Sequence, residues 1–155
     1  MSKYLVFMVG LLYSLSSVWA ANPSINKLNT CVALVEFVDS KLDDYADHYS
    51  SEDMAVVHRG LSAYRSFLQD DVVTPKLLSM YGGNAVQAKL MQTLFDRQKK
   101  TFASHLNERY TEKKLFTDYA AAINDCTAYT RIKPEVVKSL NTALDRMILM
   151  GRQVK

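Results

Sequence analysis

The chain has 155 residues, of which 48% are hydrophobic and 23% are charged, as in an ordinary globular protein. Its length allows one domain with one sizeable core. The net charge of +3 is small, the basic residues are spread over several segments, and no recognised nucleic-acid-binding motif is present. These features argue against nucleic acid as a partner.

The first residues follow the three-part pattern of a secretory signal. Lys3 supplies positive charge, residues 4–15 are almost wholly apolar, and the small residues Val18 and Ala20 occupy the positions that a signal peptidase recognises. The apolar run is shorter than the roughly 20 residues that a stable membrane span needs. We therefore predict cleavage after Ala20; an uncleaved N-terminal anchor is the alternative interpretation.

This pattern divides the chain into a signal peptide, residues 1–20, and one folded domain, residues 21–155. It predicts export to the periplasm or to the outside of the cell.

Cys31 and Cys126 are the only cysteines, and no C-x-x-C spacing is present, so we expect one structural disulfide in that oxidising compartment. A redox-active or metal-binding pair is the alternative, but redox motifs usually hold both cysteines close in sequence.

Glycine and proline are scarce, and apolar residues recur in steps of three and four, which favours long amphipathic helices. We expect a helix end at Gly82 and Gly83, a cap at Asn84 and a break at residues 69–71. No segment alternates apolar and polar residues for long enough to predict a strand. The expected helices cover residues 24–49, 51–68 and 75–81, the long stretch after Asn84, the segment from Thr111 to Cys126, and the segment from Pro134 onward.

The predicted fold is therefore all-α: a single-domain helical bundle of about four major helices and one or two short ones, with one disulfide. In the longest helix, the apolar residues are expected to form one buried side. That side consists of Val86, Leu90, Leu94, Phe95, Phe102 and Leu106.

No motif for catalysis, phosphate binding or metal binding is present, so we predict no catalytic residues, no metal ligands and no cofactor. Asp44 and His48 would share a face of the first helix, but a metal needs three or four convergent ligands.

A noncovalent haem site is the open alternative. Met54 and His58 lie one turn apart on one helix and cannot ligate an iron from opposite sides. His105 could pair with Met54, Met80 or Met91, although methionine at helical spacing is usually a core residue.

The charge is unevenly distributed along the chain. Residues 21–71 contain 4 basic and 9 acidic residues, and residues 72–155 contain 14 basic and 7 acidic residues. The two halves could neutralise each other inside the fold, or the basic half could present a surface to an acidic partner.

We identify a candidate partner-binding set in the second half. The densest positive group comprises Arg97, Lys99, Lys100, Lys113 and Lys114. Arg97 and Lys100 are three residues apart and share a helix face, whereas Lys99 points elsewhere. Tyr81, beside the two glycines, is expected to be exposed and available for binding.

The sequence favours an exported, non-enzymatic protein that acts by binding another protein, as immunity proteins, chaperones and secretion accessories do. The alternative is a carrier of a small ligand or haem in the bundle interior. A hydrolase with a site assembled from scattered residues is a third hypothesis, because fold class alone does not determine function.

Overall fold

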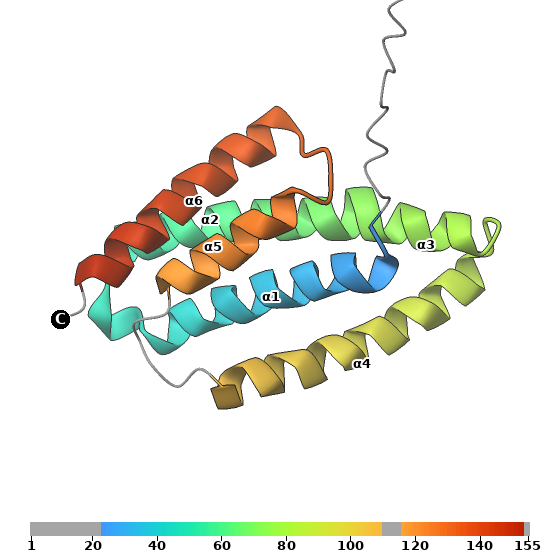
Figure 1. The fold of residues 1–155 in the computed structure, drawn as a ribbon, viewed down its shortest axis with the longest axis horizontal. Coiled ribbons are helices and arrows are strands. Elements are labelled where there is room, and N and C mark those ends of the chain that lie inside the picture. The colour runs from blue at the N-terminus through green and yellow to red at the C-terminus, as the bar shows by residue number, and fades with distance from the viewer. Residues whose placement is uncertain (1–22, 110–115, 154–155) are drawn as a thin grey trace, which may run out of the picture.

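The computed structural model describes residues 23–109 and 116–153, and these residues form an all-α bundle (Figure 1). The predicted fold class is confirmed. The predicted signal peptide lies outside the described residues. Within them, no helix is both long and apolar enough to cross a membrane. The helical elements are α1 (Ile25–Asp44), η1 (Ala46–His48), α2 (Ser51–Ser66), η2 (Phe67–Val73), α3 (Thr74–Met80), α4 (Ala85–Arg109), α5 (Phe116–Thr127) and α6 (Pro134–Gln153).

The helix α1 lies at the centre of the bundle and packs against α2, α4 and α5 (Figure 1). Ser24 caps its start by accepting a hydrogen bond from the backbone N–H of Lys27. Half of its 20 residues are buried, including three valines and Phe37. It ends at Asp44 rather than continuing to Tyr49 as expected, and a short 3₁₀ segment carries the chain toward α2.

The expected break at residues 69–71 is wrong. The chain continues from α2 through the π-helical segment η2 directly into α3. Buried Phe67, Leu68 and Val73 hold this segment against the core, so packing outweighs the polar sequence between them. At its end the backbone N–H of Thr74 donates to the carbonyl of Gln69, five residues back. The wider turn leaves space for the ring of Pro75, which clashes with the preceding carbonyls in a regular α-helix.

The helix α6 packs along α2 and α5 and completes the core with Leu140, Met147 and Met150. It passes close to α2 at Gly60, which is buried. A Cβ atom at position 60 would lie 2.6 Å from the carbonyl oxygen of Ser139 and would collide with the Cβ of Ala143. The two helices can therefore approach this closely only with glycine at position 60.

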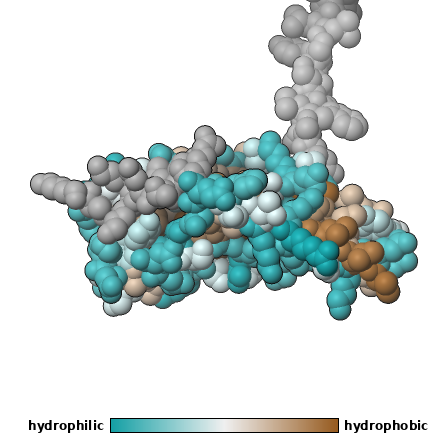
Figure 2. Space-filling model, turned by 90° about the horizontal axis from the view of Figure 1, so that it is seen from below, coloured by the Kyte–Doolittle hydropathy of each residue, from teal (hydrophilic) through white to brown (hydrophobic). Residues whose placement is uncertain are grey.

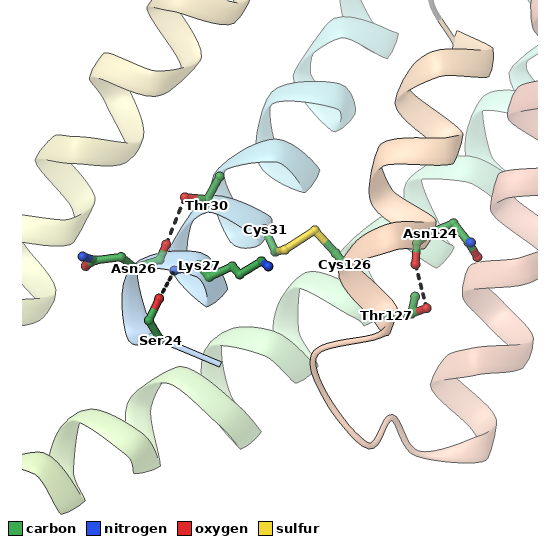
Figure 3. Close-up of a disulfide and its surroundings, with 8 residues drawn as sticks. All are labelled: Ser24, Asn26, Lys27, Thr30, Cys31, Asn124, Cys126 and Thr127. Atoms are coloured by element: carbon green, nitrogen blue, oxygen red, sulfur yellow. Dashed lines mark hydrogen bonds between the residues drawn. A yellow bond between two sulfur atoms is a disulfide. The ribbon is translucent and has the colours of Figure 1, made fainter. Parts of the chain in front are cut away.

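The predicted disulfide between Cys31 and Cys126 is confirmed. It joins the start of α1 to the end of α5, which run side by side (Figure 3). The two Cα atoms are 5.8 Å apart, and 95 residues separate the cysteines in the sequence. Among the described residues no cysteine is free. The bond therefore closes a loop that contains most of the described fold.

The disulfide predicts a measurable loss of stability when it is removed. Cys126→Ala should lower the free energy of unfolding by about 2–5 kcal/mol, because the long loop is no longer closed in the unfolded chain. Chemical denaturation measures this loss, and reduction of the wild-type protein should produce a shift of similar size. Thiol titration of the oxidised protein in denaturant should find no free thiol. Two reactive thiols would contradict the pairing.

The close crossing of α2 and α6 predicts an unusual cost for a small substitution. Gly60→Ala should destabilise the fold, because contact with the backbone of Ser139 costs about 1–3 kcal/mol and outweighs the gain in helix propensity. Gly151→Ala in α6 is the matched control. Its new methyl group would lie 3.4 Å from the nearest atom, so this change should be neutral or slightly stabilising. Equal unfolding midpoints for the two variants would refute the tight crossing.

Candidate binding surface

The turn between α3 and α4 determines where the long helix begins. Gly82 and Gly83 have positive φ angles of 58° and 84°, which glycine adopts at low cost, and they end α3 as predicted. The predicted cap is also confirmed, because the side-chain oxygen of Asn84 accepts hydrogen bonds from the backbone N–H groups of Val86 and Gln87. The local sequence thus sets both the direction and the starting point of α4.

The helix α4 carries two apolar stripes, and only one of them is buried. Phe95 is buried, and Met91, Phe102 and Leu106 pack against the core from the same side. The expectation that Val86, Leu90 and Leu94 would join them is wrong, because all three are exposed. Successive residues are 100° apart on a helix, so the two stripes point in different directions. The aromatic stripe buries the larger area, which explains the choice between them.

Polar contacts between α4 and α1 fix the rotation of α4 about its axis. The Nζ atom of Lys99 lies 3.2 Å from Oε1 of Glu36 in α1 and 3.1 Å from Oδ1 of Asp96. Nearby, the buried amide of Asn29 donates to the carbonyl of Phe95. Lys99 thus points away from Arg97 and Lys100, as predicted, and contributes to packing within the fold.

A second polar chain links α4 to η2. The amide of Gln69 donates to the side-chain oxygen of Gln92, and the amide of Gln92 donates to Asp96, each at 3.0 Å. With Lys99 and Glu36, these groups connect three helical elements through one series of hydrogen bonds and ion pairs. Turning α4 to bury Val86 and Leu90 would break the two contacts that join it to other elements, Gln69–Gln92 and Lys99–Glu36.

The exposed side chains form a surface that we name the α3–α4 apolar surface. Figure 2 shows the hydrophobic atoms gathered at the end of the molecule where α3 meets α4. An isolated exposed leucine needs no explanation, but a row on one helix with further apolar residues beside it is typical of an interaction site. The members and their exposed fractions are Leu78 39%, Met80 55%, Val86 79%, Leu90 65% and Leu94 41%.

Two of the predicted partner-binding residues lie close to this surface. Arg97 and Lys100 are exposed on α4, and neither side chain makes an ion pair with another described residue. Lys113 and Lys114 lie outside the described residues. Tyr81 is half-buried and packs against the core, so the expectation that it is exposed is wrong. Its backbone N–H closes α3 by donating to the carbonyls of Leu77 and Ser79.

The histidines are distributed differently from the sequence-based expectation. His48 is exposed in the 3₁₀ segment beyond α1, so it does not share a helix face with Asp44. His58 of α2 has its Nδ1 atom 2.6 Å from Asp39 and its Nε2 atom 3.3 Å from Asp43. Both ring nitrogens thus face carboxylates of α1, and the imidazole joins the two helices. No group of three or more potential metal ligands occurs among the described residues.

Several other titratable groups take part in packing or pairing within the fold. A surface hollow of about 590 Å³ contains Lys76 and Lys133, but Lys76 donates to the carbonyl of Pro23 and Lys133 is 2.8 Å from Asp71. The hydrogen bond to Asp71 raises the pKa of Lys133. Burial raises the pKa of Tyr64, which lies in the core and stacks on Phe67. These groups are occupied in packing or pairing and do not converge on a common point.

Comparisons with family models, with curated proteins and with solved structures find no match to this chain. The most distinctive features of the described surface are the α3–α4 apolar surface and the basic residues of α4 that form no ion pair, Arg97 and Lys100.

The assignment of the two stripes of α4 predicts opposite responses to similar truncations. Phe95→Ala should cost about 3–5 kcal/mol of unfolding free energy, because it leaves a cavity between α4 and the core. Leu90→Ala should change stability by less than about 0.5 kcal/mol, because this side chain is mostly exposed. Urea denaturation of the two variants tests the rotation of α4, and a large loss for Leu90→Ala would mean that the wrong stripe is assigned to the core.

Proposed function

We propose that this protein is exported and acts without catalysis, by binding another protein through the α3–α4 apolar surface. The observation that carries the proposal is the row Val86, Leu90 and Leu94, which stays exposed on a helix whose opposite side is packed. Burying such side chains in a complex contributes about 1.5–3 kcal/mol for each one that is fully covered.

The scaffold supports a binding role because its stability does not depend on this surface. The core is formed mainly by α1, α2, α5 and α6, and the disulfide ties α1 to α5. The exposed row lies on the long helix α4, which Asn84 caps at its start and which Lys99 links to Glu36 of α1. A rigid, preorganised surface loses little conformational entropy on binding.

The disulfide and the sequence of residues 1–20 support export to the periplasm or beyond. Disulfides persist in oxidising compartments, and a secretory signal is the route to them. The exposed Arg97 and Lys100 extend the same face of α4 toward its C-terminal half. They support a partner with acidic groups, since basic residues at an interface rim accelerate association with an acidic surface.

Capture from host extract tests this function. We expect the wild-type protein to retain a specific protein that Val86→Ser with Leu90→Ser does not retain. The double charge reversal Arg97→Glu with Lys100→Glu should weaken capture, and wild-type capture should fall as salt rises, because rim charges are screened. Quantitative mass spectrometry of the retained fraction measures both effects.

Two controls separate binding from folding. All variants should keep the wild-type unfolding midpoint, because exposed side chains contribute little to stability. Lys138→Glu, at an exposed site on α6, should capture the partner as well as wild type does. Identical captured proteins from wild type and from the Val86→Ser, Leu90→Ser variant would refute the proposed function.

A further inference from the structure

We infer that the segment bound on the α3–α4 apolar surface is an amphipathic helix of another protein with carboxylates along one edge. This inference rests on the proposed function and specifies the chemistry of the partner. It follows from the spacing of the exposed row and from the position of the basic residues relative to it.

The exposed row has the geometry that one helix presents to another. Val86, Leu90 and Leu94 are each four residues apart, so they stack along one side of α4 with a rise of about 6 Å per step. Ridges of this i, i+4 type pack into the grooves of a facing helix. Leu78 and Met80 widen the apolar surface from the α3 side. A helix with its own apolar side chains at steps of three and four can cover this surface.

The charges beside the row lie on one side only. On a helical wheel, Lys89 and Lys100 fall on one edge of the row, Arg97 continues the row beyond Leu94, and Gln87 and Gln98 occupy the other edge. Lys89, Arg97 and Lys100 are all exposed. The acidic residue in this stretch, Asp96, is already engaged by Lys99 and Gln92. Asp96 and, from α1, Glu36 line a hollow together with Lys100, but both carboxylates pair with Lys99. The edge therefore keeps an excess of positive charge, and none of its three exposed cations forms an ion pair with a described residue.

This one-sided charge decides between the possible occupants. A second copy of the chain would bring three more cations to the same edge, and like charges across an interface are unfavourable. A lipid surface would meet both edges of the row alike, so it would not match a charge that lies on one edge only. A partner helix with carboxylates on one edge matches both the apolar row and the charge. Its acidic groups would lie up to about 21 Å beyond the residue that covers Val86, at the level of Lys100.

Site-specific photocrosslinking identifies the occupant directly. The full chain is expressed in its own host with Leu90→benzoylphenylalanine, and the adduct is mapped by mass spectrometry after illumination. We expect crosslinks to a helical segment of another protein in which Asp or Glu follows the apolar residues along one edge. Lys138→benzoylphenylalanine, at an exposed site on α6, is the control and should give an adduct yield about tenfold lower.

Charge exchange then tests the acidic edge. Adding Arg97→Glu and Lys100→Glu to the crosslinking chain should reduce the adduct about tenfold, and replacing the mapped partner carboxylates by lysine should restore it. Adducts on a protein segment without such carboxylates would overturn this inference and leave protein binding intact. Adducts confined to lipid or to a second copy, or a yield no higher than at position 138, would overturn both.

Discussion

The packing of α1 determines the rest of the structure, because this helix is apolar on most of its circumference and must be covered on several sides. Val32, Val35 and Val38 are completely buried, which places helices on more than one face of α1. The helices α2 and α5 pack against two of these faces, and the disulfide holds the end of α5 beside the start of α1. The helix α4 covers the remaining side, but through Lys99, Glu36 and Asn29 as much as through apolar contacts.

Periodicity and local chemistry were sufficient to predict most of the fold. The steps of three and four, the glycine pair at 82–83 and the cap at Asn84 are local signals, and each corresponds to a backbone feature that forms within a few residues. The pairing of Cys31 with Cys126 followed from counting cysteines. The break at residues 69–71 was predicted wrongly because buried Phe67, Leu68 and Val73 keep that polar stretch helical, and this is a tertiary effect.

The surface of α4 could not be predicted from the sequence alone, because its apolar residues fit two stripes and periodicity does not rank them. The choice depends on neighbours that are distant in sequence: Glu36 holds Lys99, and Asn29 binds the backbone at Phe95. The exposure of Tyr81 was misjudged for a similar reason, because a residue beside a turn can still pack against the core. The role of Arg97 and Lys100 was inferred from charge density, whereas the apolar row beside them became visible only in three dimensions.

The polar contacts under α4 also explain why an exposed apolar row is tolerated. Hydrophobic contacts alone would allow α4 to rotate about its axis and bury Leu90 at the expense of Phe102, which is only partly buried. Rotation would separate Lys99 from Glu36 and leave the amide of Asn29 without its acceptor. A buried polar group that loses its partner costs about 1–3 kcal/mol, comparable to the gain from covering one leucine. Directional bonds on the inner side of α4 therefore keep its second apolar stripe facing outward, where a partner can reach it.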